Sequence, residues 1–310
     1  MLPFSFYIQA SKRAYWAVDR YKHQITVEAT ARRMKDSVEK IIASSTPYDT
    51  SESERAYDQL AKLYSGPGEY GYGDRENWQR GISRAERIVQ AIPTLTPRSQ
   101  ALEVGCGDGM TARALASFGI TMHLTDLQDW RDPRAHELAF DAIDLAVEAI
   151  PLPGGPYDLI YSFNAFEHFP NPASVLHRMQ SALRPGGYIY LDFGPLYCGP
   201  WGLHAYRMLP MPYPQFLFSE DFIDNKLRSL GIRDLGQDLD ELQPLNRWRV
   251  EQFDSLWASS HCEVVLNNHY TLDSHIDLVT RFPKAFSGRG LTYADITTQG
   301  LNVLIKKPAI

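Results

Sequence analysis

An acidic residue stands just before three closely spaced glycines near the first third of the chain. Glu103 precedes Gly105, Gly107 and Gly109, and the residues around Glu103 are apolar, which is typical of a buried strand. Glycine lacks a Cβ, so such a turn lets bare backbone come close to a flat, adenosine-bearing ligand. A helix that begins after the turn adds a positive partial charge at its N-terminus. The Glu103 carboxylate would repel a pyrophosphate but suits a ligand that carries an ammonium or sulfonium group.

The same turn could instead be a phosphate-binding loop or a simple tight turn. A dinucleotide fingerprint requires Gly or Ala at its sixth position, where helix and strand pack closely. Counting from Gly105, that position holds Met110. The spacing therefore disfavours a nicotinamide-dependent dehydrogenase.

Three later segments complete a pattern in which acidic or polar residues follow strands. The segment 121–126 ends in Asp126, the segment 157–168 ends in a Glu-His pair, and 183–187 is a Leu-Arg-Pro-Gly-Gly turn. With the glycine turn, these segments resemble the class I S-adenosylmethionine-dependent methyltransferases, specifically the small-molecule enzymes of the methyltransferase type 11 kind. The resemblance covers residues 80–194, with a weaker continuation over 246–308.

The resemblance implies an α/β fold: a Rossmann-like, seven-stranded methyltransferase sheet with helices on both faces. Alternating strand and helix patterns agree with a mainly parallel sheet. We expect an N-terminal helical extension over 1–75, a methyltransferase domain over 76–310, and a substrate-binding insertion at 195–245. The last strand should run antiparallel beside the sixth. The expected strands are 100–104, 121–126, 139–144, 157–162, 187–193, 262–271 and 301–306.

The resemblance also implies S-adenosyl-L-methionine as the cofactor. Its contacts would lie at the carboxyl ends of the strands. Asp141 is an alternative to Asp144 for the adenine amino group, because the register of the third strand is uncertain from sequence. The implied contacts are Glu103 for the methionine amino group, Gly105, Cys106 and Gly107 for close backbone approach, Asp126 for the ribose hydroxyls, Leu127 and Asp144 for the adenine, and Asn164 for the methionine part.

Two histidines are candidates for a general base, since imidazole titrates near neutrality. His204 lies after the fifth strand and His168 after the fourth. The Glu-His pair at 167–168 could instead only shape the pocket. Glu167, His168 and His204 could also share a divalent metal, but they form no compact ligand motif, so we expect no metal.

An aromatic and proline-rich segment, 193–218, follows the fifth strand. Tyr197, Trp201 and Tyr206 are its candidate substrate-binding residues, although these rings could form a small core of their own. We expect methyl transfer to a small apolar or aromatic acceptor in specialised metabolism, with oxygen favoured over nitrogen or carbon. A non-methylating rearrangement and a non-catalytic binding subunit are the alternatives.

Composition and charge indicate which partners, cross-links and cellular locations to expect. The 310 residues carry a formal net charge of -6 and no dense Lys/Arg cluster, which disfavours nucleic acid as the partner. Three scattered cysteines predict no disulfide framework. We expect no membrane span, no secretion signal in the short apolar start, and a cytoplasmic location. Helical patterns within 4–46 predict a partial lid or a surface that packs on a second subunit in a homodimer.

Overall fold

The computed structural model describes residues 32–67, 71–146, 151–234 and 237–309. The chain divides into two compact units, each described by itself: Met1–Asp49 with Ser274–Tyr293, and Thr50–Asp273 with Ala294–Ile310. The first unit contains a helix over 32–42 and the short helices α9 (Asp277–Arg281) and α10 (Pro283–Phe286). The amphipathic pattern expected between residues 14 and 25 lies outside the described residues.

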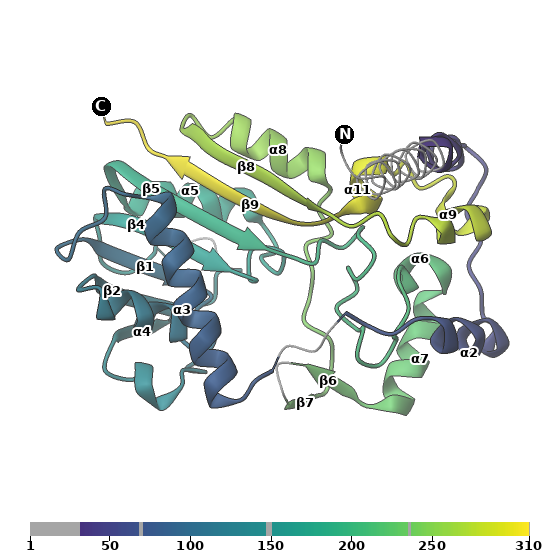
Figure 1. The fold of residues 1–310 in the computed structure, drawn as a ribbon, viewed down its shortest axis with the longest axis horizontal. Coiled ribbons are helices and arrows are strands. Elements are labelled where there is room, and N and C mark those ends of the chain that lie inside the picture. Colours follow the sequence, from purple (N-terminus) through teal and green to yellow (C-terminus); the bar gives the residue numbers. More distant parts are fainter. Residues whose placement is uncertain (1–31, 68–70, 147–150, 235–236, 310) are drawn as a thin grey trace, which may run out of the picture. The chain divides into compact units, whose positions relative to one another are not determined.

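The second unit is built on one seven-stranded sheet, which confirms the expected fold class (Figure 1). Its order is β3-β2-β1-β4-β5-β9-β8. The strand β9 pairs antiparallel with both β5 and β8, as expected for the last strand. The strands are β1 (Gln100–Val104), β2 (Thr121–Asp126), β3 (Ala139–Ala142), β4 (Tyr157–Phe163), β5 (Leu183–Phe193), β8 (Glu263–Thr271) and β9 (Thr298–Lys306).

Helices cover both faces of this sheet and create two apolar cores. On one face, α3 (Asp74–Ala91) and α4 (Met110–Ser117) pack through residues such as Ile88 and Leu115. On the other, α5 (Pro172–Ala182) and α8 (Val250–Ala258) pack through residues such as Met179 and Phe253. Because side chains alternate along a strand, β1 sends Leu102 and Val104 to the α5–α8 face and Ala101 to the α3–α4 face.

The insertion after β5 forms its own small elements. These are α6 (Pro214–Leu217), α7 (Glu220–Leu230) and the hairpin of β6 (Ile232–Asp234) and β7 (Gln237–Leu239). The helix α2 (Glu54–Leu63) lies near this insertion, since Tyr57 contacts the rings of Phe218 and Phe222. A short 3-10 helix (Pro133–Ala135) follows β2, and α11 (Tyr293–Thr297) leads into β9.

Several boundaries differ from the sequence expectation. The fifth strand begins at Leu183 rather than 187, because Leu183 already pairs with Tyr157 before an irregularity in the ladder. The third strand ends at Ala142. The N-cap of α2 is Ser53, whose hydroxyl accepts from the Ala56 N–H.

The helix α3 begins directly after a glycine. Gly73 is the N-cap, and Asp74 is the first helical residue. An acidic residue in the first turn still favours the helix through its dipole. None of the described helices is long and apolar enough to cross a bilayer.

Candidate functional site

The turn after β1 needs glycine at specific positions. Gly105, Gly107 and Gly109 have φ angles of 71°, 51° and 69°, a region that L side chains rarely adopt. A Cβ on Gly105 would lie 2.6 Å from the Ala165 Cβ, whereas a Cβ on Gly107 would meet nothing within 4 Å. The turn is therefore packed on one side at Gly105 and open at Gly107.

The carboxylate of Asp126 holds this turn against the end of β2. Its Oδ2 accepts from the Gly107 N–H at 2.8 Å, and its Oδ1 accepts from the Leu127 N–H at 2.7 Å. Burial raises the pKa of Asp126, and these two N–H groups counteract the rise. A carboxylate has about four acceptor positions, so both oxygens can still accept from a diol. Leu127, next in the chain, is 65% exposed.

The two candidate aspartates near β3 lie in different surroundings. Asp141 is within the strand, and its Oδ2 lies 2.7 Å from Nε2 of His123. Asp144 lies beyond the carboxyl end of the strand, where its Oδ1 accepts from the Ala146 N–H at 2.8 Å. Of these two aspartates, Asp144 is therefore the one that lies beyond the carboxyl end of β3.

Glu103 is a buried carboxyl group on the α3–α4 face of the sheet, with only 2% of the residue exposed. It lies opposite Tyr161 in the ladder between β1 and β4. Among the described residues, no hydrogen-bond partner satisfies its Oε2. Burial raises the pKa of Glu103 to about 8, and the positive charge of Arg84 opposes the rise. A buried, unsatisfied carboxyl group of this kind favours a cationic or hydrogen-bond-donating ligand.

Cys106, inside the turn, is not a nucleophile. Its thiol is buried, and burial raises its pKa, so the group stays protonated at neutral pH. Its contribution to the turn is through the backbone, where the Cys106 N–H donates to the Thr125 carbonyl at 3.1 Å.

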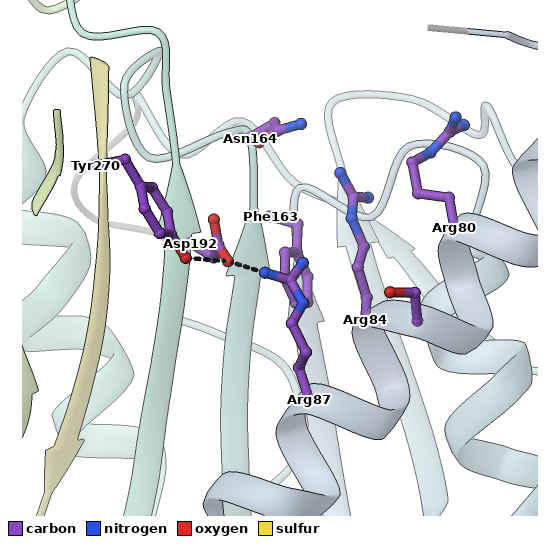
Figure 2. Close-up of a pocket in the computed structure, with 8 residues that line it drawn as sticks. Arg80, Arg84, Arg87, Phe163, Asn164, Asp192 and Tyr270 are labelled. Atoms are coloured by element: carbon purple, nitrogen blue, oxygen red, sulfur yellow. Dashed lines mark hydrogen bonds and ion pairs between the residues drawn. The ribbon is translucent and has the colours of Figure 1, made fainter. Parts of the chain in front are cut away.

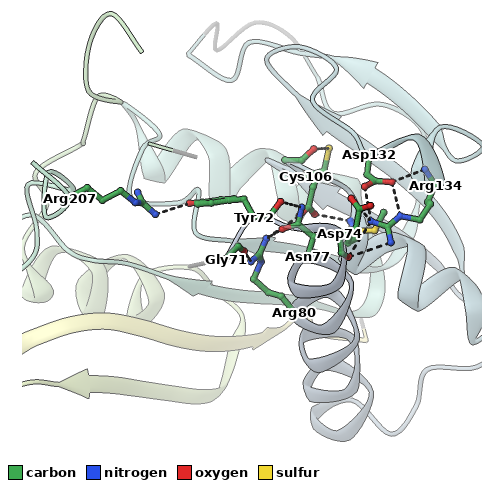
Figure 3. A network of polar contacts seen from close by, with 12 residues as sticks. Gly71, Tyr72, Asp74, Asn77, Arg80, Cys106, Asp132, Arg134 and Arg207 are labelled. Atoms are coloured by element: carbon green, nitrogen blue, oxygen red, sulfur yellow. Dashed lines mark hydrogen bonds and ion pairs between the residues drawn. The ribbon is translucent and has the colours of Figure 1, made fainter. Parts of the chain in front are cut away.

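Arginine ties the start of α3 to the glycine turn. Arg80 Nη2 donates to Asn77 Oδ1 at 2.6 Å and to Asp108 Oδ2 at 3.2 Å, and its Nη1 donates to the Gly71 carbonyl (Figure 3). The network therefore connects the loop before α3 with the loop after β1.

A cavity of about 220 Å³ opens between α3 and the ends of β4, β5 and β8 (Figure 2). Asn164, one of the expected cofactor residues, is part of its wall. The other residues of this cavity were not predicted from the sequence, although arginines at 80, 84 and 87 have the spacing of one helix face. The residues that line the cavity are Arg80, Ser83, Arg84, Arg87, Phe163, Asn164, Asp192 and Tyr270.

The structure brings the two candidate histidines together. The rings of His168 and His204 are 5.1 Å apart between centroids and nearly perpendicular. His168 Nδ1 lies 2.8 Å from the Pro244 carbonyl, and His204 Nε2 lies 2.7 Å from the Pro195 carbonyl. A carbonyl oxygen can only accept, so these nitrogens carry the protons. Neither ring belongs to the lining of the cavity.

Burial lowers the pKa of His204 to about 4, and the neighbouring His168 adds to the effect. His204 is therefore neutral at pH 7. A general base is most effective when its pKa is near the working pH, so His204 is a weak base in this position.

Glu167 lies beside this pair as a buried carboxyl group. Its Oε1 accepts from the Gly194 N–H at 3.1 Å, and burial raises its pKa. Within the described parts of the chain, no group of three or more His, Cys, Asp or Glu side chains is arranged to hold a metal ion. The arrangement thus offers two neighbouring imidazoles, each hydrogen-bonded to a backbone carbonyl.

The aromatic residues of the insertion mostly pack inside it. Trp201 is only 5% exposed. The Tyr197 ring meets Phe216 edge-on and also lies under the Arg247 guanidinium, and Tyr206 lies under that of Arg207. Tyr197 and Tyr206 remain partly exposed.

Comparison with protein families adds a direct match. Residues 75–215 match the model of a methyltransferase domain. This segment is a methyltransferase domain. It includes α3, the glycine turn, β1 to β5 and both candidate histidines.

Curated relatives of the methyltransferase domain have more than one acceptor. The sarcosine/dimethylglycine N-methyltransferase of Halorhodospira halochloris is 27% identical over 176 residues, which cover 53% of this chain and 63% of that protein. A ubiquinone biosynthesis O-methyltransferase of Bordetella avium is 29% identical over 117 residues, which cover 35% and 48%. The chain thus spans about half to three-fifths of the length of these curated relatives.

Solved structures resemble the chain only loosely. Phosphoethanolamine N-methyltransferase 2 of Haemonchus contortus, in complex with S-adenosyl-L-methionine, has a TM-score of 0.46 and 15% identity, and the match covers 73% of this chain and 52% of that one. A SAM-dependent methyltransferase of Methanosarcina mazei has a TM-score of 0.43 and 17% identity, covering 72% and 98%.

Proposed function

We propose that this chain binds S-adenosyl-L-methionine at the carboxyl ends of β1 to β4 and transfers its methyl group to a small molecule. The observation that carries the proposal is Glu103, a buried carboxyl group with an unsatisfied oxygen at the end of the strand that leads into the glycine turn. A ligand with an ammonium group and a sulfonium charge would supply the missing partner. The open side of Gly107 supports close approach of that ligand to the backbone.

Each strand end has a role in this proposal. Glu103 accepts from the methionine amino group, and the two oxygens of Asp126 accept from the ribose hydroxyls. Leu127 packs against the adenine, and Asp144 accepts from its amino group. Asn164 contacts the methionine part at the entrance of the cavity.

The bound cofactor supplies an activated methyl group on a positively charged sulfur. The protein has to orient the acceptor in line with that methyl group and to exclude water. Orientation of this kind lowers a barrier by about 7–11 kcal/mol.

A proton must leave the acceptor when it is a hydroxyl or an ammonium group. We propose His168 as the group that takes it, with His204 as its neutral neighbour. In the neutral imidazole of His168, donation from Nδ1 to the Pro244 carbonyl leaves Nε2 as the nitrogen that can accept a proton. The Nε2 atom lies 3.9 Å from Oε1 of Glu167, which would stabilise an imidazolium. The curated relatives include both N- and O-methyltransferases, and oxygen is our proposed acceptor atom.

The proposal is tested by titrating the full-length protein with S-adenosylhomocysteine in a calorimeter, with NAD as the comparison ligand. We expect saturable binding of S-adenosylhomocysteine and none of NAD. Glu103→Gln should weaken the binding by about ten-fold, the effect of losing one charge-assisted hydrogen bond of ~1.5 kcal/mol. Equal affinity of Glu103→Gln and wild type would refute the role of Glu103, and absence of binding to wild type would refute the function.

A further inference from the structure

Positive charge is concentrated on one side of the cavity. Arg80, Arg84 and Arg87 come from the same face of α3 and all line the cavity, and Figure 2 shows Arg87 directed toward Asp192 at the end of β5. The described lining contains a single carboxylate, that of Asp192. The cavity therefore carries an excess of positive charge at neutral pH.

Asp192 already has partners of its own. Its Oδ2 accepts from Arg87 Nη1 at 2.5 Å and lies 3.4 Å from the Tyr270 hydroxyl. Burial raises the pKa of Asp192, and the Arg87 guanidinium opposes that rise. A guanidinium has five N–H donors, so Arg87 can bind a second anion without releasing Asp192.

Two of the guanidinium groups are oriented by an aromatic ring. The Phe163 ring centroid lies 4.7 Å from Cζ of Arg84 and 5.4 Å from Cζ of Arg87. Contact with an aromatic face fixes the direction of the N–H edges of a planar guanidinium. Such edges match a carboxylate or a phosphate, which they can bind with two parallel hydrogen bonds.

Arg80, the third arginine, lies next to the glycine turn. Arg80 contacts Asp108 in the glycine turn and the Gly71 carbonyl. Along α3, the arginines thus run from the glycine turn at Arg80 to the end of β5 at Arg87. Asn164, the residue proposed to contact the methionine part, also lines the cavity.

We propose that the methyl acceptor carries a carboxylate or phosphate group, which Arg84 and Arg87 bind in this cavity. The inference rests on the proposed function. An acceptor anchored there would direct its remaining part past Asn164 toward the methyl group. The Phe163 and Tyr270 rings would border its apolar part, so the anionic group is compatible with an aromatic or apolar body. A volume of about 220 Å³ suits a small molecule.

One other ligand offers the same chemistry, namely the carboxylate of the cofactor's own methionine part. Substitution of Arg87 distinguishes an anionic group of the acceptor from the carboxylate of the cofactor. Arg87 lies at the β5 end of the cavity and is not among the groups that affect the Glu103 pKa. If Arg87 binds the acceptor, its substitution alters anion binding and leaves cofactor affinity unchanged.

The experiment uses the full-length protein saturated with S-adenosylhomocysteine and titrated with inorganic phosphate and with acetate at low ionic strength. The variants are Arg87→Gln and Arg87→Lys, which keeps the charge beside Asp192 but loses the planar fork. Arg75→Gln is the matched control, because Arg75 is an exposed arginine of the same helix outside the cavity. Thermal unfolding of each variant reports whether it is folded.

We expect at least one of the two anions to bind wild type and Arg75→Gln equally. Its affinity should fall by about ten-fold in Arg87→Gln and by a smaller factor in Arg87→Lys, as for the loss of charge-assisted hydrogen bonds. Cofactor affinity should stay within about two-fold of wild type in all three variants, a difference of under ~0.5 kcal/mol. The reason is that Arg87 binds the acceptor and not the cofactor in this proposal.

Two outcomes would overturn the inference. One is that neither anion binds wild type more tightly than Arg87→Gln. The other is a parallel loss of S-adenosylhomocysteine affinity in Arg87→Gln, which would assign the guanidinium to the cofactor. Failure of the proposed function itself is a separate result, because it appears as absence of S-adenosylhomocysteine binding to wild type.

Discussion

Glu103 and Asp126 are both carboxyl groups at strand ends, yet their surroundings differ. Asp126 accepts two backbone N–H groups, which favour its charged form. Glu103 has an oxygen without a partner in the described part of the chain, and its pKa rises to about 8. Ligand binding therefore has different consequences at the two sites: Asp126 already has two N–H donors, whereas Glu103 must lose a proton to pair with an ammonium group.

Substitution of Asp126 by Ala should weaken S-adenosylhomocysteine binding by about ten-fold or more, ~1.5–3 kcal/mol for a charge-assisted hydrogen bond. Part of the loss comes from the Gly107 N–H, which loses its acceptor. Asp141→Ala is the matched control, since Asp141 lies on the neighbouring strand and pairs with His123. Calorimetry measures both, and unchanged affinity in Asp126→Ala would contradict the assignment of the β2 end.

Cofactor affinity should depend on pH through Glu103. The free protein holds Glu103 mainly protonated below pH 8, and a bound ammonium group favours the ionised form. The affinity for S-adenosylhomocysteine should therefore rise by nearly ten-fold between about pH 6 and 7. The amino group of the ligand stays protonated over this range, because an α-amino group titrates at higher pH. Titrations of wild type and Glu103→Gln at each pH measure this, and a slope that persists in the variant would assign the proton to another group.

At the scale of the elements, the glycine turn positions the site because it joins three strand ends. Its backbone is held by the Thr125 carbonyl at the end of β2, and its Gly105 packs on Ala165 after β4. The sequence predicted this turn because glycine spacing is a direct requirement of the backbone. It did not predict the cavity, because the arginines of α3 meet Asp192 and Tyr270 only after α3 packs across the sheet.

Gly105→Ala and Gly107→Ala should separate the stability of the turn from ligand binding. Both substitutions place a side chain at positive φ, at roughly 1–2 kcal/mol each. Gly105→Ala also brings its Cβ to 2.6 Å from Ala165, so its thermal stability should fall further. Gly107→Ala has room for the methyl group but should lose S-adenosylhomocysteine affinity. Thermal unfolding and calorimetry check both, and a larger stability loss in Gly107→Ala would contradict the packing described.

At the scale of the whole molecule, the sheet order follows from residue patterns that the sequence displays. The apolar runs at 100–104 and 157–162 predict strands covered on both faces, and both are buried strands in the structure. Boundaries were less predictable: Leu183 joins β5 only because Tyr157 of β4 offers it a partner. The roles of the insertion aromatics also required tertiary contacts, since Trp201 becomes buried among its neighbours.

The core between the sheet and α8 should dominate stability. Phe253 is fully buried and contacts the rings of Phe193 and Trp257. Phe253→Ala should lower the free energy of unfolding by about 3–5 kcal/mol, because it removes a large buried ring and leaves a cavity. Leu256→Ala, on the same helix and only partly buried, should cost less. Urea denaturation measures both, and a similar small loss in each would contradict the position of this core.

A crystal structure of the full-length protein grown with S-adenosylhomocysteine tests the central claim most directly. We expect the ribose hydroxyls at the Asp126 carboxylate, the amino group at Glu103, and the sulfur directed toward the cavity beside Asn164. Adenosine bound elsewhere, or a phosphate group in the glycine turn, would contradict it.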